Sequence, residues 1–468
     1  MLFGNAMLFT NATLVTMNPT RDIVTDGAIA VEGPRIVQVG KSKDLRGSYP
    51  EEQTIDLGGK LVIPGLVDTH VHLAQAMLRG SADELTLIPW LCERIWVLQG
   101  NYTEADGYAS ARLCIAEMLK SGTTTFLEAM LAHRYGFDGI AQAVEESGIR
   151  ACLGGIVMDV GTYATQTAAM HPGMIESRES LRGVVAMHDK WHGRADGRIH
   201  VWFGPRTPGG VTPELYREMS AIARERNMGI TMHLAEVEAD RTFLQSEYGL
   251  SPVRYAERVG LLGPRSVLVH MIWLDDGDVA LLAQTGTHVS YNPSSNAKLG
   301  SGVCDVQRLL DRGVNVALGC DGAPANNDYD LIREMKFGSL VQKAVSRNAT
   351  VLPAETMLEM ATLGGARALG LEREIGSLEV GKRADFAVVD LHRAHTVPAF
   401  RPVSTLVYAA TGGDVDTVVV DGRIVVSGGV LRSMNEAEIL AEANARAAQV
   451  YRRAGLSGAM TRSAWPVL

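Results

Sequence analysis

Short apolar runs alternate with longer helical stretches between residues 61 and 383. The runs are rich in β-branched residues and are bounded by Gly, Pro or Ser, which is typical of β-strands. Eight of them stand out, at residues 61–70, 123–127, 150–155, 199–204, 229–233, 266–270, 287–290 and 315–321. Such alternation favours a parallel sheet, and eight β/α units over about 320 residues predict an α/β fold, a (β/α)8 TIM-like barrel.

The two ends of the chain have a different pattern, with short β-rich segments and tight turns. Strands are predicted at residues 12–16, 27–31 and 35–39, and a further strand and a hairpin at 384–390 and 416–426. Neither end alone buries enough apolar area for a stable core. We therefore expect residues 1–60 and 384–468 to form one small composite β-sandwich domain, with a last helix near 435–454, beside a barrel domain of residues 61–383.

The amino-acid composition of the chain indicates which kinds of partner to expect. The net charge of −9 argues against nucleic acid or an anionic membrane as partner. No apolar run approaches the roughly 20 residues needed to span a bilayer, and the first seven residues lack the basic segment of a signal peptide. The five cysteines are scattered and form no C-x-x-C pair. We expect free thiols in a reducing cytoplasm, and any metal to be held by His and Asp.

Polar residues gather where the predicted strands end. His70 and His72 end the first strand, His233 the fifth, His270 the sixth and Asp321 the eighth. Side chains at i and i+2 of a strand point to the same side, and the carboxyl ends of barrel strands converge on one pocket. Three imidazoles and a carboxylate suit Zn²⁺ or Fe²⁺. We expect His70, His72, His233 and Asp321 to hold one divalent metal ion with a position open for water, and His270 to lie next to them.

Two neighbouring features refine this site. The fourth strand ends at Gly204-Pro205-Arg206 and carries no lysine that could bridge two metals, which favours a single ion. Glu236 follows His233 by three residues, and a carboxyl buried beside a metal pocket can have its pKa raised enough to donate a proton. Asp321 can accept a proton from water and later deliver it to a leaving group.

Several motifs resemble the amidohydrolase superfamily. They are Pro-Gly-Leu-Val-Asp-Thr-His-Val-His at 64–72, His-Leu-Ala-Glu at 233–236, His270, and the segments 294–302, 319–323, 358–362 and 375–385. The resemblance covers nearly the whole chain. It is closest to the branch that holds atrazine chlorohydrolase, melamine deaminase and the S-adenosylhomocysteine, methylthioadenosine and guanine deaminases.

The resemblance implies a mononuclear metal hydrolase with zinc as the first choice of ion and iron as the second. It places ligand roles on His70, His72, His233 and Asp321, a proton-donating role on Glu236 and a polarising role on His270. It also implies a homo-oligomer and a small heterocyclic substrate. The positions expected to contact that substrate are Gln75, Trp90, Arg206, Tyr291, Asn296 and Asn326.

The chain departs from its relatives at three places. Arg206 stands where adenosine-type deaminases often have His, and Tyr291 where many relatives have His; both argue against an adenosine-like substrate. Gly322 and Ala325 stand where the chlorohydrolase has Asn and Ser, which argues against dechlorination. Arg206 has two interpretations: a bidentate contact to a substrate carbonyl or anion, or an ion pair with a carboxylate such as Glu236 or Glu238.

Together these features predict a hydrolytic deaminase of an aminated N-heterocycle, of purine, pterin, pyrimidine or s-triazine type. Hydroxide on the metal would attack an electron-poor ring carbon, Glu236 would protonate the adjacent ring nitrogen, and Asp321 would pass a proton to departing ammonia. The same site could instead release chloride or an alkylamine, or open a cyclic amide. A metal kept only for structure or binding is the third alternative, but a structural zinc has four closed ligands and needs no acid beside it.

Overall fold

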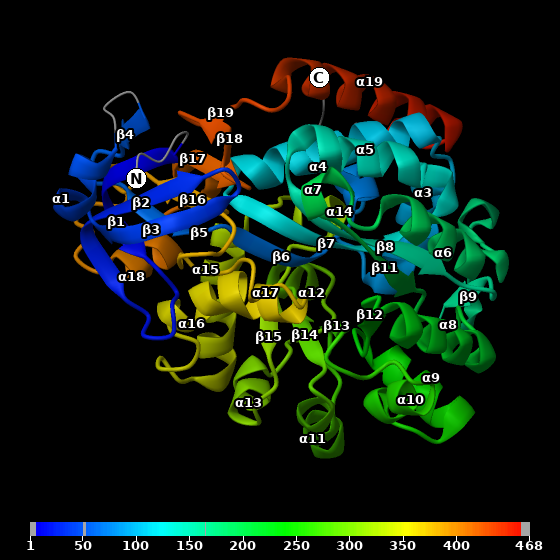
Figure 1. Cartoon of the computed structure of the whole chain (residues 1–468). Helices are drawn as coiled ribbons and strands as arrows, with labels where there is room; N and C mark the ends of the chain where they lie inside the picture. The colour runs from blue at the N-terminus through cyan, green and yellow to red at the C-terminus, as the bar shows by residue number, and fades with distance from the viewer. Residues whose placement is uncertain (1–5, 50–52, 164, 460–468) are drawn as a thin grey trace.

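The structure, a computed structural model, describes residues 6–49, 53–163 and 165–459. Eight parallel strands form the barrel (Figure 1), in an order that follows the sequence. They are β6 (Leu66–Val71), β7 (Thr123–Leu131), β8 (Arg150–Val157), β11 (Ile199–Pro205), β12 (Ile230–Leu234), β13 (Ser266–His270), β14 (His288–Tyr291) and β15 (Val316–Leu318). The predicted (β/α)8 barrel is confirmed.

The first and last barrel strands meet at the residues expected to bind metal. Val71 and Asp321 form a parallel bridge, and the Asp321 N–H donates to the carbonyl of His70 at 2.7 Å. The buried Asp68 ties the same two strand ends together, because its Oδ1 accepts from the N–H groups of His70 (3.1 Å) and Cys320 (3.2 Å). Closing the barrel therefore fixes the backbone on both sides of the site.

Helices surround the barrel and start and stop where the sequence supplies caps. In α8 (Pro213–Arg226), Thr212 Oγ1 accepts from Leu215 N–H, Pro213 occupies the first turn, and Asn227 ends the helix in the left-handed region. The other longer helices are α4 (Glu104–Lys120), α5 (Phe137–Ser147), α6 (Glu179–Trp191), α9 (Glu238–Tyr248), α11 (Asp276–Thr285), α15 (Leu331–Ser346) and α19 (Glu436–Arg453). None of the helices in the described ranges is long and apolar enough to cross a membrane.

Both chain ends join in one mixed sheet of nine strands, as the composite domain requires. Its order is β19 (Val430–Leu431), β18 (Arg423–Ser427), β17 (Val415–Val420), β16 (Phe386–Val389), β5 (Leu61–Pro64), β1 (Ala6–Val15), β2 (Ile23–Glu32) and β3 (Arg35–Lys41), with β4 (Thr54–Asp56) paired to β1. Phe9 and Phe386, one from each end, pack edge to face with ring centroids 5.1 Å apart.

One expected strand is in fact two. The segment 61–70 is divided at Gly65, and β5 pairs with β1 and β16 of the terminal sheet while the first barrel strand begins at Leu66. Glycine is required at the break, since a Cβ on Gly65 would lie 2.0 Å from Thr124 Oγ1. The continuous apolar run hid this break, because buried strands of two different sheets have the same hydrophobic pattern.

Buried and exposed ion pairs join the two parts of the chain. Arg150, at the start of β8, contacts Asp385 (3.1 Å) and Asp421 (2.6 Å), and all three side chains are almost fully buried. The last helix, α19, lies along α4 in Figure 1, where Lys120 pairs with Glu436 at 2.6 Å. The Arg150 pairs thereby tie the terminal sheet to the amino end of a barrel strand, and α19 packs along the outside of the barrel on α4.

Candidate active site

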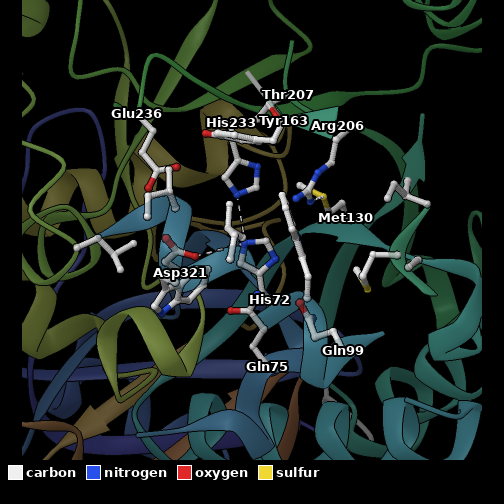
Figure 2. A pocket seen from close by; sticks show the side chains of 18 of the residues that line it. His72, Gln75, Gln99, Met130, Tyr163, Arg206, Thr207, His233, Glu236 and Asp321 are labelled. Carbon is white, nitrogen blue, oxygen red and sulfur yellow. Dashed lines mark hydrogen bonds and ion pairs between the residues drawn. The ribbon is translucent and has the colours of Figure 1, made fainter. Parts of the chain in front are cut away.

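Three imidazoles and one carboxylate converge at the carboxyl ends of the barrel strands, and Figure 2 shows His72, His233 and Asp321 among them. The Nε2 atoms of His72 and His233 lie 3.2 Å apart, and Asp321 Oδ1 lies 3.4 Å from His70 Nε2 and 3.3 Å from His72 Nε2. Two nitrogen ligands bound to a tetrahedral zinc at about 2.0–2.1 Å would lie about 3.3 Å from each other. The spacing of these side chains therefore fits a single small divalent ion.

The chemistry of the donor set fits a metal as well. His70 is fully buried, and within the described residues neither of its ring nitrogens has a hydrogen-bond partner. Burial lowers the pKa of His72 to about 3, although Asp321 opposes this, and burial lowers the pKa of His233 well below its usual value. Neutral imidazoles are the form that binds a metal. Buried unpaired nitrogens are costly unless an ion occupies the space between them.

Asp321 is held in its ionised form by donors. The Ser295 hydroxyl donates to its Oδ2 at 2.7 Å and the Gly322 N–H to its Oδ1 at 2.7 Å. Hydrogen bonds to a carboxylate favour its charged state. Asp321 has φ 67° and His270 has φ 73°, a left-handed conformation that is rare outside glycine. Such strain persists where the surrounding fold fixes it, and it is common at functional sites.

Glu236 lies just beyond β12 and is buried, 4% exposed. Its Oε2 is 3.5 Å from His270 Nε2, and its N–H donates to Asp240 Oδ2 at 2.9 Å. Burial, with a further contribution from the negative charge of Asp321, raises the pKa of Glu236 well above the usual value for a glutamic acid. A carboxyl that stays protonated near neutral pH can act as a general acid.

A pocket opens beside these residues, and Gln75, Trp90 and Arg206 line it as expected from the sequence. Figure 2 shows Arg206 across His233 from Glu236 and Asp321. Arg206 is buried, and its Nη1 lies 3.0 Å from Met130 Sδ. Its guanidinium carbon lies 5.1 Å from the ring centroid of Trp96.

The other three expected substrate contacts lie outside the pocket lining. Tyr291 faces α15, where Gln342 Nε2 donates to its hydroxyl at 3.2 Å. Asn326 donates to the Cys320 carbonyl (3.0 Å) and to Glu334 Oε1 (2.9 Å), and so supports the turn that carries Asp321. Asn296 Oδ1 contacts His270 Nδ1 at 2.8 Å, behind the pocket wall.

The position of Tyr291 follows from strand geometry. Its neighbour Ser290 has its Oγ 2.8 Å from Thr69 Oγ1 of the first barrel strand. Adjacent side chains on a strand point to opposite sides, so Tyr291 packs outward in the apolar layer between the barrel and α15. The sequence comparison matched Tyr291 with a histidine of its relatives and did not take this alternation into account.

The sequence analysis also missed part of the pocket wall. Trp96, Gln99, Tyr163 and Thr207 line it, together with Tyr135 and Met174. They come from four different loops or short elements, and no common motif or period links them along the chain. Of these residues, only Thr207 could have been predicted to line the pocket, because it directly follows Arg206 at the end of a strand.

Comparison with known proteins agrees with this fold. Residues 61–425 match the model of the Amidohydrolase family. The chain is 41% identical to a 5'-deoxyadenosine deaminase of Methanothermobacter thermautotrophicus, over 91% of this chain and 95% of that protein. It is 40% identical to a 5-methylthioadenosine/S-adenosylhomocysteine deaminase of Desulforudis audaxviator, over 89% and 93% respectively. A zinc-bound crystal structure of an adenosine deaminase from Xanthomonas campestris superposes with a TM-score of 0.87 at 33% identity, covering 96% of this chain and 98% of that one.

A barrel whose strand ends bring three histidines and an aspartate together is a metal-dependent hydrolase scaffold. The chain belongs to the amidohydrolase family.

Proposed function

We propose that this protein is a metal-dependent aminohydrolase that deaminates an aminated N-heterocycle. The observation that carries the proposal is the pairing of two features in one buried pocket. His70, His72 and His233 lie close enough together to hold a divalent ion, Asp321 lies beside His70 and His72, and Glu236, a carboxyl whose pKa burial raises, lies in the same pocket. The curated relatives, named as deaminases of adenosine derivatives, support this reaction class.

When bound, the ion would acidify water and so supply a nucleophile at neutral pH. The side chains then have separate tasks. Asp321 takes the proton of that water and later gives it to the amine. Glu236 protonates the ring nitrogen next to the reacting carbon, so that negative charge does not build up on the ring. His270 supports the reacting oxygen through its Nε2, which faces Glu236 and Asp321.

The reaction balances without a further reactant. One water adds its oxygen to the ring carbon, the bond from that carbon to the amino nitrogen breaks, and ammonia leaves with the proton that Asp321 delivered. The ring nitrogen keeps the proton from Glu236, and the second proton of the water restores Glu236. The product is the corresponding ring carbonyl compound. Gly322 and Ala325 offer no side chain suited to another leaving group, which favours an amine over chloride.

Three further properties belong to the proposal. Zinc is the proposed ion, because three imidazoles and a carboxylate are a common zinc set, with Fe²⁺ as the second choice. A reducing cytoplasm suits the five free cysteines, four of which are buried. A homo-oligomer suits Phe400, which is 90% exposed, and Val345 and Leu340 on α15, which are 63% and 46% exposed. Light scattering of the purified protein decides the last point.

The test is ammonia release by protein whose metal content has been measured. The panel holds aminated purines, pterins, pyrimidines, s-triazines and adenosine nucleosides, with chloride and alkylamine followed in parallel. Ammonia in step with product, and lost on chelation, is the expected result. Chloride or alkylamine without ammonia would overturn the leaving group while leaving the site intact. No turnover of any compound by protein with about one ion bound would contradict the proposal.

A further inference from the structure

Besides His270, which the proposed chemistry uses, four pocket side chains present buried polar atoms that have no hydrogen-bond partner among the described residues. They are Gln75 Oε1, Trp90 Nε1, Arg206 Nε and Thr207 Oγ1. Burying a polar atom without a partner costs free energy, and such atoms are rare in folded proteins. Four of them around one pocket indicate a ligand that pairs with them. The set comprises two donors, one acceptor and one hydroxyl that can do either.

Arg206 is the charged member of this set. In the part of the chain that the structure describes, it forms no ion pair, and its partners are Met130 Sδ and the face of Trp96. Neither the predicted pair with Glu236 nor the one with Glu238 forms. Glu238 instead lies 3.7 Å from Arg241. A buried guanidinium without a carboxylate needs an acceptor rich in negative charge, and a ring carbonyl or an enolate oxygen is such an acceptor.

The remaining wall suits a flat, bare ring. Leu91, Trp96, Tyr135 and Ile156 supply apolar and aromatic surface. Glu236 and Asp321 are the carboxylates among the described lining residues, and the proposed chemistry uses both. The hydroxyl groups of a ribose would therefore find no free carboxylate to pair with and only uncharged groups such as Gln99 and Tyr135 in the remaining wall, which disfavours a nucleoside.

We infer that the substrate is a free, oxo-substituted aminoheterocycle, that is, an aminated purine, pterin or pyrimidine base with a ring carbonyl. Arg206 and Trp90 donate to the carbonyl oxygen, and Gln75 Oε1 accepts from a ring N–H. This inference rests on the proposed function and assigns a specificity-determining role to Arg206. The carbonyl that Arg206 holds keeps its bonds, while the amine leaves from the carbon on the side of Glu236.

The test compares pairs of bases that differ in the oxo group alone: guanine with 2-aminopurine, and isocytosine with 2-aminopyrimidine. Adenosine and 5'-deoxyadenosine complete the panel. For one oxo-bearing base, kcat/KM should exceed that of its partner by at least about 100-fold, because a site built to pair with a polar group rejects the analogue that lacks it. Equal rates within a pair, or faster turnover of the nucleosides, would overturn the inference. Ammonia would still be released in that case, so the proposed function would stand. No ammonia from any compound would refute both.

Variants connect the preference to Arg206. Arg206→Met should reduce the ratio within a pair to less than about 10-fold, and Arg206→Lys should restore part of it by keeping the charge. Arg182→Met, at a side chain that is 81% exposed on α6, is the matched control and should leave the ratio unchanged. Fluorescence titration with unreactive xanthine and purine adds a readout without turnover. Arg206→Met should weaken xanthine binding and leave purine binding unaffected, and an equal loss for both would contradict the assignment.

Discussion

Asn296 and His270 form a buried pair in which Asn296 Oδ1 lies 2.8 Å from His270 Nδ1. Because an amide oxygen only accepts, Nδ1 carries the ring proton. Asn292 Nδ2 is the more distant neighbour of the same nitrogen, at 3.3 Å. The other nitrogen, Nε2, is then free to accept a hydrogen bond in front of Glu236. The two residues thus fix which side of the imidazole faces the reaction.

We expect Asn296→Ala to lower kcat by about 10- to 100-fold with little change in KM, because the ring loses its orientation while the pocket wall keeps its shape. Asn296→Asp, which retains the acceptor, should recover much of the rate and shift the pH profile of kcat. Steady-state kinetics of both variants check this. A change in KM alone would mean that Asn296 contacts substrate, as the sequence first suggested.

Removal of one imidazole should remove the ion. His72→Ala should carry less than about a tenth of the zinc bound by the parent protein after gel filtration, since three ligands hold zinc far less tightly than four. Metal analysis by mass spectrometry measures this directly. His392→Ala, at a side chain that is 60% exposed, is the control. Full metal occupancy in His72→Ala would exclude this residue as a ligand.

Loss of the proposed acid should stop proton transfer and spare the metal. Glu236→Gln should reduce kcat by about 10²- to 10⁴-fold at unchanged metal content. Because burial raises the pKa of Glu236, the parent enzyme should lose activity only when high pH deprotonates Glu236. The residual activity of the variant should not show this loss at high pH. Glu238→Gln, exposed on α9, should behave like the parent protein. A near-normal rate in Glu236→Gln would refute its role.

His200, at the start of β11, lies beside His192, which in turn lies beside His188, and this cluster should make stability depend on pH. Burial, assisted by His192, lowers the pKa of His200 to about 3. The unfolded chain binds a proton on His200 near pH 6.5, whereas the folded chain does so only near pH 3. His200 therefore leaves the folded state unaffected above pH 6.5 and destabilises it as pH falls from 6.5 towards 3. At pH 5 the loss reaches at most about 2 kcal/mol. Melting temperatures at pH 7.5 and 5.0 should therefore differ less in His200→Gln than in the parent protein, and an equal difference would contradict the assignment.

The ion pairs below the barrel should be essential for stability. Arg150→Met leaves the buried Asp385 without its arginine, while Asp421 keeps Arg383 (3.3 Å) and Arg198 (3.5 Å), and it should cost about 3–5 kcal/mol of unfolding free energy. Chemical denaturation measures this, with the exposed Arg182→Met as control. A loss of less than about 1 kcal/mol would mean that the two carboxylates are satisfied by their remaining hydrogen bonds.

The sequence was informative wherever chemistry and local pattern coincide. His70, His72, His233 and Asp321 each follow a strand-forming run, so their meeting point could be predicted from the general geometry of barrels. Glu236 could be placed by its distance from His233. These expectations needed no knowledge of how distant loops pack.

What depends on long-range packing could not be predicted. Whether Arg206 has an acidic partner depends on all the residues that surround it in the fold. Trp96 and Tyr163 reach the pocket from loops without a motif. The outward direction of Tyr291 depends on where β14 begins, and a shift of one residue would reverse it. The break at Gly65 was hidden for a similar reason, because β5 and the first two residues of β6 are equally apolar.

The central claim is hydrolytic deamination, and turnover in ¹⁸O-labelled water tests it most directly. Zinc-loaded protein and the best base of the panel should give one ammonia per product, and each product molecule should carry one heavy oxygen at the carbon that held the amine. Glu236→Gln should give almost no labelled product in the same time. Product without heavy oxygen, or heavy oxygen without ammonia, would contradict the account.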